Sequence, residues 1–160
     1  MNISSMENKI GSLNRVSGHT FDIIYNLLFT TERAIAMIIE HPLDIPKMPG
    51  SFGMFLGDGF TRRGERSERN KIMDERLRLY EKQTFDELVS DHDFNFEIPY
   101  NKVDRVELTR GLFEARLLFH IPEKLSGESK ILFTLTKKQF SEASHILDQV
   151  LPSKLNIPKR

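Results

Sequence analysis

The residues best suited to contact a partner lie in one glycine-rich apolar segment. Five of the nine glycines of the chain fall between Gly50 and Gly64. The large apolar side chains that we expect to matter most there are Phe52, Phe55, Leu56 and Phe60. Clustered aromatic side chains on a loop need burial somewhere. We therefore expect a protein–protein or oligomer contact through residues 50–66. The alternative is that this segment folds back and packs its Phe side chains on its own domain.

A basic stretch follows this apolar segment directly. Arg62, Arg63 and Arg66 open a region, residues 62–82, with eight basic and five acidic residues and thus a net charge of +3. An apolar tip beside basic side chains also suits an anionic membrane surface, which is the alternative partner. Nucleic acid is not expected, because glutamates interrupt the arginines and the whole chain is neutral, with 23 basic and 23 acidic residues.

Catalytic chemistry has little support in the sequence. Asp91-His92-Asp93 combines metal-ligand residue types, but no second cluster accompanies it at ligand spacing, so a polar loop is favoured and no metal is expected. The chain has no phosphate-binding loop, no H-E-x-x-H and no G-x-S-x-G. We expect a non-enzymatic protein without a cofactor. A second alternative is an enzyme whose site lies between residues 43–93 and the rest of the domain.

Length and composition indicate one cytoplasmic domain. A chain of 160 residues without cysteine folds without disulfides or a Cys-based metal site. No stretch is apolar enough for a membrane-spanning helix. Residues 1–18 are polar and lack the apolar core of a secretory signal. They are expected to form a loose leader, with a short strand near Leu13–Val16 at most.

The first strands and a charged helix can be read from periodicity. Apolar residues alternate from Phe21 to Phe29 and again from Ile35 to Ile39, which predicts a one-sided antiparallel hairpin. Three prolines between 42 and 49 then end regular structure. Residues 62–82 are expected to form a charged helix whose narrow apolar stripe is Met73, Leu77 and Tyr80. Thr84-x-x-Glu87 predicts a capping box at the start of a short helix.

The second half alternates in the same way before a final helix. Strands are predicted over 94–98, 106–108, 115–121 and 131–135. Thr136 and Gln139 predict a second capping box. Apolar residues from Phe140 to Leu151 then recur with a period of 3.6. Pro152 ends this helix, and residues 152–160 are expected to be a frayed tail.

Two short motifs resemble bacterial PH and GRAM-type domains. Leu27-x-x-Thr30-x-x-Arg33 resembles the hairpin of these domains, and Ile98-Pro99-x-x-x-Val103-x-x-Val106 resembles their step into a middle strand. The resemblance covers residues 19–42 and 94–151. It implies an α+β fold, a PH-like antiparallel barrel or sandwich over 19–151, closed by the C-terminal helix and interrupted by an insertion at 43–93. Such domains bind lipid headgroups, peptides or proteins. The phosphoinositide-binding subset carries several basic residues around the first hairpin loop, where this chain has Arg33.

Overall fold

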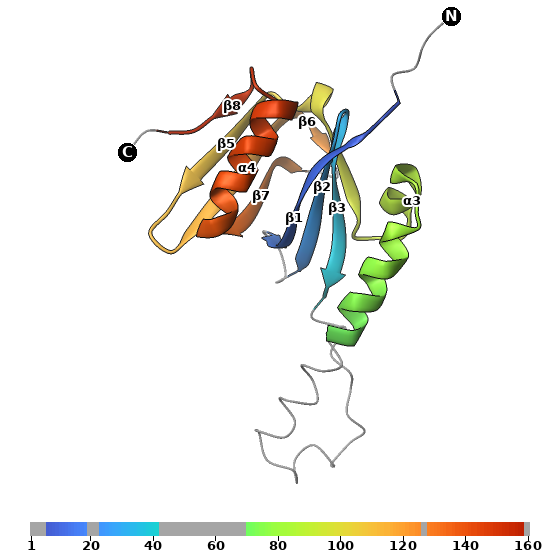
Figure 1. Ribbon diagram of the computed structural model, residues 1–160. Helices are drawn as coiled ribbons and strands as arrows, with labels where there is room; N and C mark the ends of the chain where they lie inside the picture. The colour runs from blue at the N-terminus through green and yellow to red at the C-terminus, as the bar shows by residue number, and fades with distance from the viewer. Residues whose placement is uncertain (1–5, 19–22, 42–69, 126–127, 159–160) are drawn as a thin grey trace, which may run out of the picture.

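The structure is built on one mostly antiparallel sheet. The computed structural model describes residues 6–18, 23–41, 70–125 and 128–158. Within these residues eight strands hydrogen-bond in the order β4-β3-β2-β1-β7-β6-β5-β8, an open sheet with β4 and β8 at its edges (Figure 1). The strands are β1 (Lys9–Gly18), β2 (Ile24–Thr30), β3 (Arg33–Glu40), β4 (Phe96–Pro99), β5 (Arg105–Arg110), β6 (Glu114–Leu125), β7 (Glu128–Thr136) and β8 (Leu155–Asn156). The helical elements are residues 70–81, α3 (Phe85–Ser90), the 3₁₀ turn Tyr100–Lys102 and α4 (Lys137–Val150).

Strand β1 joins the two halves of the sheet. It pairs with β2 from Lys9 to Ser17, and its last residues, Ser17 and Gly18, pair with β7. The side chains of Leu13 and Val16 are fully buried. The expectation of a loose leader over residues 1–18 is therefore wrong for residues 9–18, whose backbone and apolar side chains are part of the sheet and the core.

A β-bulge interrupts the alternation of apolar side chains along β1. Leu13 and Val16 are three positions apart, so in a regular strand they would point to opposite faces. The pairing with β2 shifts register between them, and Arg15 has a positive φ of 56°. The extra residue turns both apolar side chains to the same face. The Arg15 backbone N–H donates to Asn26 Oδ1 at 3.0 Å, and Asn26 is buried.

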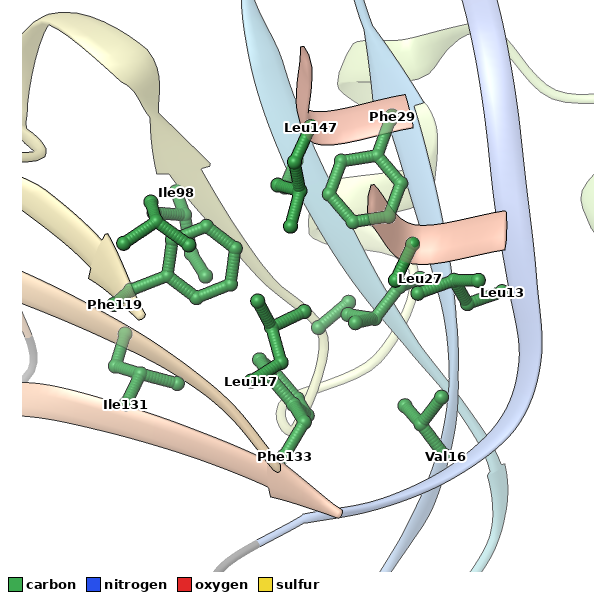
Figure 2. Packing of buried hydrophobic residues seen from close by; sticks show 14 of the residues in the cluster. Leu13, Val16, Leu27, Phe29, Ile98, Leu117, Phe119, Ile131, Phe133 and Leu147 are labelled. Atoms are coloured by element: carbon green, nitrogen blue, oxygen red, sulfur yellow. The ribbon is translucent and has the colours of Figure 1, made fainter. Parts of the chain in front are cut away.

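Side chains from the two halves of the sheet meet in the main core. Figure 2 shows Leu27 and Phe29 of β2 on one side and Phe119 and Phe133 on the other, with Leu147 of α4 beside Phe29. The Phe119 and Phe133 rings pack edge to face, with 6.3 Å between their centroids. All five side chains are at most 1% exposed, so both halves contribute to one hydrophobic core.

Helix α4 packs on this core, as its periodicity predicts. The capping box at its start is confirmed: Thr136 Oγ1 accepts from the Gln139 N–H, and Gln139 Oε1 accepts from the Thr136 N–H. Ala143, Ile146 and Leu147 are buried. The helix lies so close to β1 that a Cβ atom at Gly11 would come within 2.8 Å of Ile146 Cδ1. The expected α+β class and C-terminal helix are confirmed.

The chain after α4 is not frayed throughout. Leu155 and Asn156 form β8, which pairs in parallel with Val106 and Glu107 of β5. Lys154 Nζ also donates to the Tyr100 carbonyl at 3.0 Å. The prediction of a frayed tail over 152–160 is wrong for residues 154–156, because the open edge of β5 offers backbone partners to an extended segment.

Strands β2 and β3 are buried on both faces. The face away from the main core forms a second hydrophobic cluster, made of Leu28, Ile35, Met37, Ile39, Met73, Tyr80 and Leu88. Helix 70–81 and α3 cover it, on the side of these strands opposite to α4 (Figure 1). The predicted hairpin is confirmed, but its predicted one-sidedness is wrong. The uninterrupted apolar run from Ala34 to Ile39 is what a strand covered on both faces requires.

The bulge gives a test of the β1 geometry. We expect Arg15→Val to lower the free energy of unfolding by about 1–2 kcal/mol, because a β-branched side chain is strained at positive φ. Arg15→Gly relieves that strain and is expected to leave stability unchanged within about 1 kcal/mol. Urea unfolding of the two variants measures the difference. Equal stabilities would contradict the assigned backbone conformation.

Candidate binding groove

The seven residues singled out as a contact surface lie outside the described residues. They are Phe52, Phe55, Leu56, Phe60, Arg62, Arg63 and Arg66. Their exposure and contacts therefore stay a prediction. The described part of the insertion begins at residue 70, in the helix that follows them along the chain.

Helix 70–81 uses its predicted apolar stripe to pack on β3. Met73 and Tyr80 are buried, and Leu77 packs against the second cluster. The helix also protects a strand edge. Strand β4 pairs only with residues 33–36 of β3, so the later residues of β3 need other backbone partners. Tyr80 Oη donates to the Ile38 carbonyl at 2.6 Å, and Arg76 Nη1 donates to the Ile39 carbonyl at 3.2 Å.

Asn95 completes this edge and was not anticipated from the sequence. Its Oδ1 accepts from the Ile38 N–H at 2.8 Å, and its Nδ2 donates to the Leu88 carbonyl at 2.8 Å. The residue is 7% exposed. A buried amide that bonds both a strand and a helix fixes α3 against β3, because each of its polar atoms would be costly to leave unpaired.

A groove of about 640 Å³ lies between these helices and the outer face of β1–β3. Its apolar lining comes from the sheet and from both helices: Leu28, Met37, Ile39, Met73, Leu77, Tyr80, Phe85 and Leu88. Its polar lining differs in charge between the two sides. Lys9 and Arg15 stand on β1, whereas Asp74 and Glu81 stand on helix 70–81. The groove therefore combines an apolar surface with a basic and an acidic border.

One polar atom beside the groove has no partner. Gln83 lines the groove, and its Oε1 is buried without a hydrogen bond, which holds for no other side-chain N or O atom in the part of the chain that the structure describes. Its Nε2 donates to Asp91 Oδ1 at 2.8 Å. An unpaired buried acceptor costs roughly 1–3 kcal/mol, and because this oxygen is closed to solvent it offers no contact to a ligand in the groove.

A second polar cluster surrounds Arg33 at the start of β3. Its Nε and Nη2 donate to the two carboxylate oxygens of Glu7 at 2.9 and 3.0 Å. Nη2 also donates to Asp86 Oδ1 at 2.7 Å, and Nη1 donates to Glu97. Burial lowers the pKa of Arg33, but the hydrogen bonds to Glu7, Glu97 and Asp86 outweigh it and hold that pKa above its ordinary value. One guanidinium thus ties together the N-terminal segment, α3 and β4.

Residues of the Leu27–Arg33 and Ile98–Val106 segments hydrogen-bond to each other at the same corner. Thr30 Oγ1 accepts from the Arg33 N–H at 3.0 Å, and the Thr30 carbonyl accepts from Tyr100 Oη at 2.8 Å. Burial raises the pKa of the Tyr100 hydroxyl above its ordinary value, with the charge of Glu7 adding to it. An anionic headgroup at this hairpin would have to displace carboxylates from Arg33. The observed role of these residues is structural.

The Asp91-His92-Asp93 sequence lies in a turn after α3. Asp91 accepts from Gln83, and His92 Nδ1 accepts from the Phe94 N–H at 3.1 Å. The His92 and Phe94 rings stack with 5.7 Å between centroids. Among the described residues, no group of three or more His, Asp or Glu side chains is arranged to hold a metal ion.

Comparison with known proteins does not identify a family. No protein-family model matches the chain, and no curated protein is significantly similar to it in sequence. In the described segments, no helix has the length and apolar character needed to cross a bilayer.

Removing the Asn95 amide tests the attachment of α3. We expect Asn95→Ala to lower the free energy of unfolding by about 1–3 kcal/mol, because it leaves the Ile38 N–H and the Leu88 carbonyl unpaired. Asn101→Ala is the matched control at an exposed position and is expected to change stability by less than about 0.5 kcal/mol. Thermal unfolding of both variants measures this. Similar losses would show that Asn95 does not fix α3.

Neutralising Glu7 or Asp86 compares the stability contributed by a largely buried partner of Arg33 with that of an exposed partner. The Glu7 side chain is 16% exposed and that of Asp86 is 90% exposed. We expect Glu7→Gln to cost about 1.5–3 kcal/mol of stability, because it weakens two charge-assisted hydrogen bonds. Asp86→Asn is expected to cost less than about 1 kcal/mol. Chemical denaturation at low and high salt compares them, and a larger effect of Asp86→Asn would overturn this assignment.

Proposed function

We propose that the chain is a non-enzymatic, PH-like binding module that holds an amphipathic segment of a partner protein in the groove beside helix 70–81. Two meanders of antiparallel strands followed by a C-terminal helix support the PH-like barrel, as does the hydrogen bond between Thr30 and Arg33 of the first resembling motif. A cytoplasmic location belongs to the same proposal.

The observation that carries the proposal is the mixed lining of the groove. Its size, about 640 Å³, lies within the usual range of ligand sites, roughly 300–1,000 Å³. Met37 and Met73 supply flexible apolar side chains of the kind found at adaptable binding surfaces.

The charges at its borders specify the chemistry of the partner. A segment with an apolar stripe would place that stripe on Leu77 and Phe85, the half-buried apolar side chains of the lining, with the largely buried Leu28 and Met37 behind them. Acidic residues beside the stripe would then face Lys9 and Arg15, and basic residues on the other side would face Asp74 and Glu81. The groove therefore favours an amphipathic peptide whose two polar flanks carry opposite charge.

Catalysis between the insertion and the sheet has weaker support. The acidic residues that line the groove, Asp74 and Glu81, are seven positions apart on one helix. Their backbones are therefore separated by about 10 Å along its axis. That spacing suits a charged border along a bound segment. The predicted contact residues Phe52, Phe55, Leu56 and Phe60, with Arg62, Arg63 and Arg66, precede this helix and stay candidates for extending the contact.

Designed peptides test the proposal. The probe is a synthetic amphipathic helical peptide with a leucine stripe, glutamates along one flank and lysines along the other. We expect calorimetry to show binding by the full chain, weakened at least about tenfold by Ser12→Trp, which fills the groove from β1. Ser129→Trp, at an exposed position on β7, is the matched control.

Charge reversal adds a specificity test. Asp74→Lys with Glu81→Lys is expected to weaken binding of that peptide and to strengthen binding of a peptide with glutamates on both flanks. Absence of binding by the wild-type chain to either peptide, or equal binding by Ser12→Trp, would overturn the proposed function.

A further inference from the structure

The tip of the β5–β6 hairpin exposes two large apolar side chains. Leu112 is 69% exposed and Phe113 is 87% exposed. The turn is tight: the Gly111 N–H donates to the Glu114 carbonyl at 2.7 Å. A Cβ atom at position 111 would come within 2.8 Å of that oxygen. Glycine at this position therefore allows a short, fixed turn that holds both side chains in water.

Basic residues surround this tip. Arg110 and Arg116 flank the turn, and Glu114 pairs with Thr136 of β7, which places Lys137 and Lys138 in the neighbouring first turn of α4. Residues 109–116 and 136–138 contain four basic residues and one acidic residue, a net charge of +3 in a chain that is neutral overall. Both lysines are exposed. The exposed apolar tip therefore stands in a positive local field.

The lysines are unfavourable for the helix that carries them. The first turn of α4 contains no acidic residue, although the helix dipole favours negative charge at that end. The Arg110 guanidinium lies over the Phe140 ring, with 5.8 Å between its Cζ and the ring centroid. This contact places a further positive charge beside the same turn. The accumulation of positive charge is therefore not explained by the stability of α4.

We propose that the β5–β6 tip anchors the protein on an anionic membrane surface, with Leu112 and Phe113 entering the headgroup region and the surrounding Arg and Lys side chains facing lipid phosphates. Interfacial binding needs only a few apolar side chains together with basic neighbours. A stable protein interface buries roughly 800 Å² on each partner. A single Phe buries only about 150–250 Å², so two side chains at a hairpin tip suit a bilayer better than a protein.

The anchor leaves the groove accessible. In Figure 1 the β5–β6 turn lies at the opposite end of the molecule from helix 70–81, which forms one wall of the groove. The tip can therefore contact a membrane whether or not a segment occupies the groove. The two proposals are independent, and either can fail alone.

A tryptophan at the tip reports insertion directly. The chain contains no tryptophan, so Phe113→Trp gives a single fluorophore. With vesicles of phosphatidylcholine and phosphatidylserine we expect its emission to shift to the blue and to be quenched by brominated acyl chains. Leu79→Trp, at a 52% exposed position on helix 70–81, is the matched control and is expected to show neither change.

Vesicle co-sedimentation of the full chain measures the contributions of the tip and the charges. Leu112→Ser with Phe113→Ser is expected to weaken binding roughly a hundredfold. Lys137→Gln with Lys138→Gln is expected to weaken it at least about tenfold, since each basic side chain contributes roughly fivefold. Lys102→Gln with Lys130→Gln is the control for net charge. Binding should fall with added salt and be weak on phosphatidylcholine alone.

Several outcomes would overturn the proposal. One is failure of the wild-type chain to bind anionic vesicles. Another is vesicle binding that survives the tip variant but is lost in Phe55→Ser with Phe60→Ser, which would assign the contact to the segment at 50–66. A third is self-association, measured by light scattering, that the tip variant abolishes while vesicle binding is absent. Unchanged thermal unfolding of the tip variant excludes misfolding as the cause of lost binding.

Discussion

The fold depends on one strand with two partners. β1 pairs with β2 along most of its length and with β7 at its end. This shared strand connects the half of the sheet that carries the insertion with the half that carries α4. The bulge at Arg15 makes the sharing compatible with a single core, because it lets Leu13 and Val16 both face inward. The buried Asn26 carboxamide that accepts the bulge N–H is part of the same arrangement.

The described part of residues 43–93 forms a second layer that covers only part of the outer face of β1–β3. Helix 70–81 and α3 cover β3, protect its edge through Tyr80, Arg76 and Asn95, and leave the groove over β1 and β2 beside them. The Arg33 cluster fixes this layer at the end where β3 begins, by joining α3 to β4 and to the N-terminal segment. The groove therefore exists because helix 70–81 and α3 leave the outer face of β1 and β2 uncovered. Its shape depends on contacts between distant parts of the chain.

Local signals in the sequence predicted the elements well, and long-range ones were missed. Both capping boxes, the β2–β3 hairpin and the apolar stripe of helix 70–81 are confirmed, because their determinants lie within a few residues. The full length of β1 was not predicted, because its bulge breaks the two-residue period of its apolar side chains. β8 was not predicted, because a strand of two residues is too short to show an alternation of apolar and polar side chains. The groove combines residues from β1 to α3, and the Arg33 cluster combines residues from Glu7 to Glu97, so no spacing in the sequence indicates either site.

The pairing of β1 also governs the order in which the chain can fold. Ser17 and Gly18 find their partners at Thr134 and Phe133, and Gly11 meets Ile146 of α4. During synthesis the β1–β2–β3 meander can form early from local contacts, yet its free β1 edge and inner apolar face stay open until β7 and α4 have emerged. Contacts at such sequence separation slow folding. The nascent chain is thus expected to need protection of that edge for most of its synthesis.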